Sequence, residues 1–224
     1  MKNLTNKLHE SRFLGRIFHT VIYCLQKELE DCESVLDLGC GPSSPLKYCK
    51  NIEYSIGVEA FKPYIEESKR QEIHTEYLEK KIGEIDFPEN SFDAVIMVEV
   101  LEHLSEKEGF EIIEKSKKWA KKKVIITTPN GFIKQNELDS NPLQKHLSGW
   151  DLEKMKKLGF KCRGLAGLKF LRREVEGDSM GNDLLASIRY KPKIFWFVAA
   201  TVSQLITYMF PRYAFELFCV KEII

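Results

Sequence analysis

The segment Val35–Pro45, VLDLGCGPSSP, combines residue types that can bring a backbone close to a polar small molecule. A short apolar run with Asp37 inside it is typical of a buried parallel strand. Gly39 and Gly41 follow directly, and glycine allows both a sharp turn and the close approach of a ligand to backbone amides. A helix beginning near Ser43–Pro45 would point its free amides at the same place. The segment therefore predicts a ligand-binding loop at the end of a strand.

Three later segments also join apolar runs to polar residues: Ile56–Lys69, Phe87–Leu104 and Val124–Gly131. In this order and spacing, and together with the glycine loop, they resemble the S-adenosylmethionine-dependent methyltransferases with a Rossmann-like fold. The loop corresponds to motif I of that family, and the resemblance spans roughly residues 35–131. It implies that the chain uses S-adenosyl-L-methionine and releases S-adenosyl-L-homocysteine.

A nicotinamide-dependent oxidoreductase is the main alternative class of enzyme. A glycine-rich loop after a strand, with an acid such as Glu59 about twenty residues later, fits both classes. Three details favour methyl transfer. Ser44 replaces the third glycine of G-x-G-x-x-G, Asp37 lies inside the strand, and the LEHL stretch ending at Leu104 has no role in dinucleotide binding.

The resemblance assigns the cofactor to the carboxyl ends of the first, second and fourth strands. Glu59 is expected to accept hydrogen bonds from both ribose hydroxyls, which a carboxylate does better than a neutral side chain. Phe61 is expected to lie against adenine, and Cys40 contributes a small side chain without a catalytic role. The expected cofactor-binding residues are Asp37, Gly39, Cys40, Gly41, Glu59, Ala60, Phe61, Ile82, Val98 and Glu99.

The segment after the third strand departs from the family pattern. Many relatives have an aspartate there that bonds the adenine amino group, but Lys81 or Ile82 occupies that position here. A lysine cannot accept this hydrogen bond. The backbone around Ile82, or the side chain of Glu84 or Asp86, would have to replace the aspartate.

His103 and His146 are the candidate catalytic residues. His103 follows the fourth strand, and parallel sheets bind ligands beyond the carboxyl ends of their strands, so it should lie near the sulfonium with Val98 and Glu99. A pKa near neutrality suits a general base for a hydroxyl or amine acceptor. Local hydrogen bonding that orders the loop explains His103 equally well, and helix capping and packing explain His146.

The elements that position these residues alternate between strands and helices. We expect an α/β fold with a doubly wound, mostly parallel seven-stranded Rossmann-like sheet, helices on both faces and an antiparallel last strand. The first crossover is expected as a helix over 45–49, the third strand with its exit over 77–85, a later helix over 108–123 and the sixth strand over 161–168. The expected organisation is an N-terminal helical cap (1–33), a cofactor-binding core (34–191), an inserted apolar helix (192–210) and the last strand (211–224).

Composition limits the class of protein further. The 34 basic and 33 acidic side chains give a net charge of +1, which does not indicate a nucleic-acid partner. The six cysteines form no CxxC pair or Cys/His grouping, which favours a reduced, cytoplasmic protein, and no metal site is expected. The N-terminus lacks the pattern of a secretory signal. A lysine-rich run at 115–123 keeps RNA methylation as the second substrate class, although such runs are usually solvated.

The segment Ile194–Phe210 contains no charged residue and is flanked by Lys191, Lys193 and Arg212. It includes polar residues and is shorter than the roughly twenty apolar residues that a membrane span requires. Three arrangements remain: a helix buried in the domain or in a homodimer, a helix in the membrane interface at the inner face, and a true span. An apolar helix beside the active site would suit a lipid-linked acceptor, so we expect O- or N-methylation of a small-molecule or lipid-linked compound.

Overall fold

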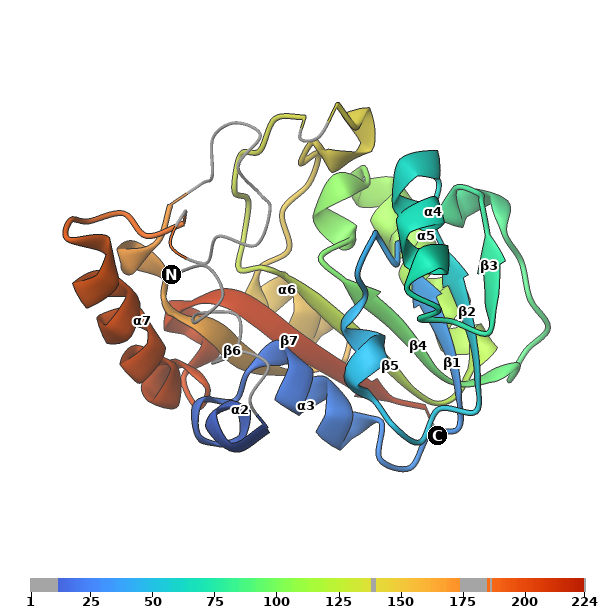
Figure 1. The fold of residues 1–224 in the computed structure, drawn as a ribbon, viewed down its shortest axis with the longest axis horizontal. Coiled ribbons are helices and arrows are strands. Elements are labelled where there is room, and N and C mark those ends of the chain that lie inside the picture. The colour runs from blue at the N-terminus through green and yellow to red at the C-terminus, as the bar shows by residue number, and fades with distance from the viewer. Residues whose placement is uncertain (1–11, 138–139, 174–184, 186, 224) are drawn as a thin grey trace.

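The computed structural model describes residues 12–137, 140–173, 185 and 187–223. Its seven strands form one sheet in the order β3-β2-β1-β4-β5-β7-β6 (Figure 1). The strands are β1 (Ser34–Leu38), β2 (Tyr54–Val58), β3 (Glu76–Leu78), β4 (Phe92–Val98), β5 (Ala120–Pro129), β6 (Lys161–Leu168) and β7 (Ala214–Glu222). Neighbours among β1 to β5 pair in parallel, and β7 lies antiparallel between β5 and β6. The expected mostly parallel sheet with an antiparallel last strand is confirmed.

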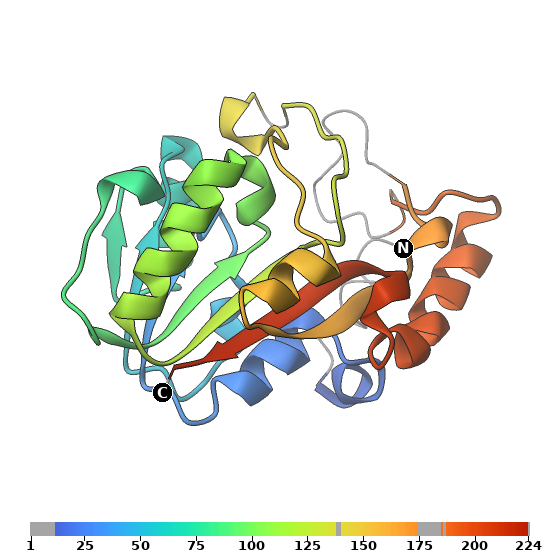
Figure 2. The same ribbon diagram turned by 180° about the vertical axis from the view of Figure 1, so that it is seen from behind.

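Helices cover both faces of the sheet. The helices are α2 (Arg12–Phe18), α3 (Val21–Glu28), α4 (Lys62–Arg70), α5 (Glu106–Trp119), α6 (Leu152–Lys157) and α7 (Lys193–Thr207). α3 lies in front of the sheet in Figure 1, and α5 and α6 cover the face seen in Figure 2. Alternate residues of β1 serve the two faces, because Val35 packs in the cluster that contains Leu25 of α3 and Leu36 in the cluster that contains Trp119 of α5. The expected cap before residue 12 lies outside the described residues.

The first crossover and the third strand are both short. The crossover expected as a helix over 45–49 is a single 3₁₀ turn, η1 (Pro45–Tyr48). Of the range 77–85, expected to hold the third strand and its exit, only the start is strand: β3 has three residues and pairs only with β2 at the edge of the sheet. The chain after β3 forms the 3₁₀ turn η2 (Ile82–Glu84) at the mouth of the cavity described below.

The lysine-rich run is divided between two elements. The helix expected over 108–123 ends at Trp119, and Ala120 already has an extended backbone at the start of β5. Lys123 is buried, and its Nζ lies 2.9 Å from Asp31 Oδ1, while Lys122 Nζ lies 3.7 Å from Asp93 Oδ2. Part of the positive charge is therefore neutralised inside the fold, which weakens the case for an RNA-binding patch.

Helix α7 is inserted between β6 and β7 and packs beside β6, the edge strand of the sheet. Its inward face is polar. Gln204 Oε1 accepts a hydrogen bond from Gly167 N at 2.7 Å, and Ser203 Oγ accepts one from Leu168 N at 3.0 Å. These side chains supply partners for the backbone of an irregular strand, because the pairing of β6 with β7 shifts register between Leu165 and Leu168.

The outward face of α7 is apolar and exposed. The exposed side chains, 44–61% accessible, are Ile194, Phe195, Val198, Val202, Leu205, Ile206, Met209 and Phe210. Six of them belong to α7, and Met209 and Phe210 follow its C-terminal end; we call the eight residues together the α7 apolar face. The expectation that the helix is buried against the domain is wrong for this face, because the polar residues take the inward positions. No helix in the described ranges is long and apolar enough to cross a membrane.

Candidate functional site

The glycine loop after β1 has the backbone that its sequence predicts. Gly39 and Gly41 both have positive φ, +65° and +57°. A Cβ on Gly39 would lie 2.8 Å from Val100 Cγ2, whereas a Cβ on Gly41 would meet nothing within 4 Å. The loop is fixed by Glu59 at the end of β2, whose two carboxylate oxygens accept hydrogen bonds from Gly41 N at 3.1 Å and Phe61 N at 2.8 Å. The two strand ends thus form one polar cradle.

Asp37 lies beneath this cradle and is 1% exposed. Its Oδ2 accepts a hydrogen bond from Ser44 Oγ at 2.5 Å and lies 2.9 Å from His74 Nε2. His74 in turn packs on β2, where a Cβ on Gly57 would lie 2.8 Å from its ring. Sequence reasoning missed His74, since it sits in a polar turn with no motif around it. The contacts of Asp37 are those of a residue that supports the loop.

A cavity of about 450 Å³ opens between the cradle, η2 and the chain after β4. The predicted site residues that line it are Gly39, Glu59, Ala60, Ile82, Glu99 and His103. The predicted residues Asp37, Cys40, Gly41, Phe61, Val98 and His146 do not line it, and their binding or catalytic roles stay predictions. Burial raises the pKa of the Cys40 thiol, which agrees with the expectation of no catalytic role.

The cavity also includes residues outside the set of expected cofactor-binding and catalytic residues. Lys80, Lys81 and Glu84 enclose it beside Ile82, and Asn141, Gln144 and Leu147 enclose it from the segment before α6. Of the two acids proposed to replace the missing aspartate, only Glu84 lines the cavity. Asp86 instead accepts a hydrogen bond from Trp119 Nε1 at 3.3 Å. The polar, aperiodic character of 131–147 was the one signal that this segment shapes a pocket.

Two carboxyl groups follow β4, and of these Glu99 lines the cavity while Glu102 does not. Glu99 has a φ of +54°, and its Oε1 accepts a hydrogen bond from Thr127 Oγ1 at 2.9 Å. Glu102 is 2% exposed, and its Oε2 accepts a hydrogen bond from Thr128 Oγ1 at 3.0 Å. Burial raises the pKa of Glu99, and burial together with the Glu99 charge raises that of Glu102 well above its usual value. Sequence reasoning missed Glu102 because its two neighbours already had explanations: Leu101 suits packing in the core, and His103 was the candidate catalytic base.

His103 and His146 come together although they are far apart in the chain. His103 ends the 3₁₀ turn η3 (Leu101–His103), His146 follows η4 (Pro142–Gln144), and their ring centroids lie 4.8 Å apart. Burial and the neighbouring His146 lower the pKa of His103 to about 4. The premise that His103 titrates near neutrality is therefore wrong. A neutral imidazole with this pKa is a weaker proton acceptor than the sequence suggested.

Residues 36–126 match the family profile described as a methyltransferase domain. The match shows a methyltransferase domain in this part of the chain, and the expected resemblance to the class I S-adenosylmethionine-dependent methyltransferases is confirmed. It is an enzyme domain whose cofactor is S-adenosyl-L-methionine. No curated protein sequence matches the chain.

Solved structures share the fold of this methyltransferase domain at low sequence identity. A SAM-dependent methyltransferase from Archaeoglobus fulgidus is similar over 94% of this chain and 98% of its own, with 18% identity and a TM-score of 0.53. The YcgJ protein from Bacillus subtilis is similar over 90% and 97%, with 13% identity and a TM-score of 0.55. The plantazolicin methyltransferase BpumL, in complex with SAH, is similar over 98% and 86%, with 13% identity and a TM-score of 0.52.

The cradle fits the cofactor of the methyltransferase domain. Each oxygen of Glu59 accepts one backbone hydrogen bond and retains a further lone pair for a hydroxyl donor. Gly41 leaves open space where any other residue would place a Cβ. Ile82 and Val100 add apolar surface to the same cavity. The residues present thus provide both polar and apolar contacts for a nucleoside.

Proposed function

We propose that this methyltransferase transfers a methyl group to an oxygen or nitrogen atom of a lipid-linked or small-molecule acceptor, with the lipid-linked class favoured. The α7 apolar face carries this preference. S-adenosyl-L-methionine, when bound, supplies a methyl group on a positively charged sulfur that is already a good leaving group. The chain's own residues therefore bind, align and exclude water, and alignment can contribute about 7–11 kcal/mol in well-oriented cases.

We assign cofactor binding to the residues of the cradle and its rim. Glu59 would accept the ribose hydroxyls, Gly39 and Ala60 would give backbone access, and Ile82 would contribute apolar contact. Asp37 would act through Ser44 and His74 by holding the loop in place. In this proposal residues 34–191 and the last strand form the catalytic core, and 1–33 and 192–210 are additions to it.

The acceptor would enter beside Glu99 and His103, which line the cavity beyond the cradle. His103 is neutral at pH 7, so it can accept a hydrogen bond from a hydroxyl or amine donor and orient the nucleophile. With a pKa of about 4 it cannot hold a proton at neutral pH. We therefore propose that His103 contributes mainly by aligning the nucleophile and only to a small extent by accepting its proton.

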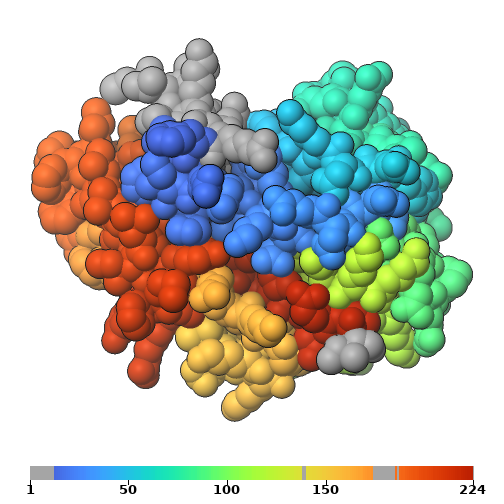
Figure 3. Space-filling model, turned by 90° about the horizontal axis from the view of Figure 1, so that it is seen from below, coloured from blue at the N-terminus to red at the C-terminus, as the bar shows by residue number. Residues whose placement is uncertain are grey.

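We further propose that the α7 apolar face lies in the surface of an anionic membrane, at the cytoplasmic side. About half of the surface of each of these eight apolar side chains would otherwise remain in water, and monomeric proteins rarely expose large contiguous apolar patches. The flanking charges are complementary to an anionic surface, because Lys191 and Arg212 are exposed and no acidic residue lies between them. Phe195 and Phe210 supply the aromatic side chains that suit the interface. Helix α2 packs beside α7 (Figure 3).

Flotation with liposomes tests the membrane contact. The wild-type chain should float with vesicles of phosphatidylglycerol and much less with phosphatidylcholine alone. The double variant Phe195→Ser, Val198→Ser should lose most of its binding without a change in fold, since both side chains are more than half exposed. Phe132→Ser is the matched control, because Phe132 is 59% exposed and lies outside α7.

Two results would contradict this proposal. Equal flotation of the double variant and the wild type would exclude α7 as the contact. A stable dimer in sedimentation analysis that the double variant dissociates would show that a second copy covers the face. Retained S-adenosyl-L-homocysteine binding in either case would leave the methyltransferase assignment intact.

A further inference from the structure

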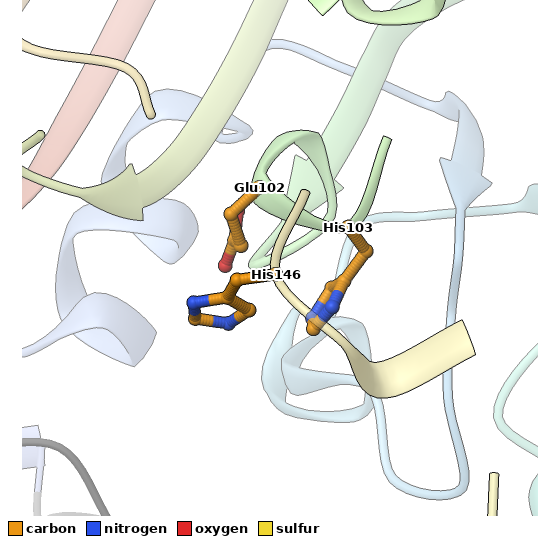
Figure 4. Close-up of side chains that lie close together, drawn as sticks. All are labelled: Glu102, His103 and His146. Atoms are coloured by element: carbon orange, nitrogen blue, oxygen red, sulfur yellow. The ribbon is translucent and has the colours of Figure 1, made fainter. Parts of the chain in front are cut away.

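Glu102, His103 and His146 form a compact cluster of metal-ligating side chains (Figure 4). Each offers one ligand atom, and these atoms all lie within 4.8 Å of one another. Glu102 and His103 are adjacent in η3, whereas His146 comes from the segment that follows η4. The cluster is therefore a product of the fold, and the cysteine and histidine spacing from which no metal site was expected gives no sign of it.

Backbone carbonyl groups orient both imidazole rings. His146 Nδ1 lies 2.6 Å from Ile133 O, and His103 Nδ1 lies 3.3 Å from Lys145 O. A carbonyl oxygen only accepts hydrogen bonds, so these contacts assign the proton of each ring to Nδ1 and a lone pair to Nε2. The same arrangement fixes the tautomer of histidine ligands in metal sites.

Glu102 supplies the third donor and an independent reason for a cation. Its side chain is almost fully buried, and its Oε1 accepts no hydrogen bond from the described residues. Glu99 adds a second carboxyl group beside it, and the two side chains interact. Two buried carboxyl groups are costly when both are charged, and either a proton held between them or a positive charge nearby relieves this cost. A metal ion would provide such a charge in place of the proton.

The backbone around the cluster holds its two segments together. Leu147 N and Ser148 N both donate hydrogen bonds to Glu102 O, at 2.7 and 3.1 Å. Trp150 Nε1 donates to Leu101 O at 3.1 Å from the same segment. The donors are therefore positioned before any ion binds, which lowers the entropic cost of binding.

We propose that Glu102, His103 and His146 bind one divalent transition-metal ion at the wall of the cavity. Two imidazole nitrogens and one carboxylate oxygen suit Zn²⁺, Co²⁺ or Mn²⁺. His103 lines the cavity, so the coordination positions that the protein leaves open face the space proposed for the acceptor. A metal ion there is a Lewis acid that can bind and polarise an oxygen of that molecule.

Calorimetric titration of the chelator-treated full chain with Zn²⁺ alone, repeated with Co²⁺, tests the site. One ion per chain is expected to bind, and bound Co²⁺ should show visible d–d absorption. His146→Asn is the decisive variant, because its amide can still donate to Ile133 O in place of Nδ1 but has no counterpart of Nε2. It should bind Zn²⁺ at least about 100-fold more weakly, beyond the 10- to 100-fold loss typical of outer-shell changes. Glu102→Gln should have a similar effect.

His19→Asn is the matched control, since His19 lies near α7 and outside the cluster. Its Zn²⁺ affinity should equal that of the wild type. Absence of saturable binding to the wild type, or unchanged affinity in His146→Asn and Glu102→Gln with native circular dichroism, would overturn the proposal. S-adenosyl-L-homocysteine titrations of the same samples separate this outcome from a failure of the methyltransferase assignment.

Discussion

The cradle and the Glu102–His103–His146 cluster differ in how their polar groups are satisfied, although Glu59 and His103 line the same cavity. In the cradle, both oxygens of Glu59 accept backbone hydrogen bonds. In the cluster, one oxygen of Glu102 accepts none from the described residues. The cradle is built by neighbouring strand ends, whereas the cluster joins two distant segments. This difference supports our proposal that a bound ion completes the cluster.

The two sides of α7 differ in the same way, because one side has its partners within the fold and the other has none among the described residues. Its buried positions are small or polar, Trp196 and Phe197 are partly buried, and the remaining large apolar side chains face outward, unlike an ordinary amphipathic surface helix. Ser203 and Gln204 accept hydrogen bonds from the backbone of β6, so these two positions on the inward side of the helix must be polar. A helix arranged in this way leaves its apolar surface for another partner.

Removing the support beneath the cradle should have the largest effect. Asp37→Asn takes the charge from a buried carboxylate that contacts Ser44 and His74, and we expect a loss of about 3 kcal/mol in the free energy of unfolding. Urea denaturation measures this loss. Asp151→Asn is the control, because aspartate and asparagine cap a helix about equally well. Unchanged stability with lost S-adenosyl-L-homocysteine binding would instead make Asp37 a direct ligand.

Weakening the cradle itself should cost about 2 kcal/mol in cofactor binding. Glu59→Gln keeps the shape of the side chain but replaces one acceptor oxygen with a donor group, which affects charged hydrogen bonds worth about 1.5–3 kcal/mol. The dissociation constant of S-adenosyl-L-homocysteine should rise roughly 30-fold in calorimetry. Glu53→Gln, at an exposed position just before β2, should bind normally. Wild-type affinity in Glu59→Gln would remove Glu59 from the binding site.

Removing the hydrogen bonds of Trp150, which connect the two segments of the metal-ligand cluster, should have the smallest effect on stability. Trp150→Phe removes the indole donor to Leu101 O and Ser148 Oγ, and we expect a loss of about 1–2 kcal/mol in stability. Zn²⁺ affinity should fall while cofactor affinity stays the same, because the cradle shares no hydrogen bond with Trp150. Trp196→Phe, in α7, provides the control. Equal losses of Zn²⁺ and cofactor affinity would show that the two sides of the cavity are not independent.

Much of the fold was predictable because its signals are local. The apolar run at Val35–Leu38, the glycine loop and the run at Phe92–Val98 each specify a strand and its exit within a few residues. β6 has the bounds that its sequence predicted, Lys161–Leu168. Predictions failed where one element depends on another: the crossover over 45–49 is a 3₁₀ turn and not a helix, and Lys121–Lys123 join β5 because the chain is extended beside β4.

The amino-acid sequence alone determined the class of enzyme, its cofactor and the strand ends that form the cradle, because glycines and an acid at fixed spacing act within contiguous segments. Only the tertiary structure decided that Asp37 contacts His74, that His103 and His146 meet beside Glu102, and that α7 turns its apolar face outward. Each of these depends on which distant residues share a buried space. Desolvation in that space, which no local pattern encodes, also lowers the pKa of His103.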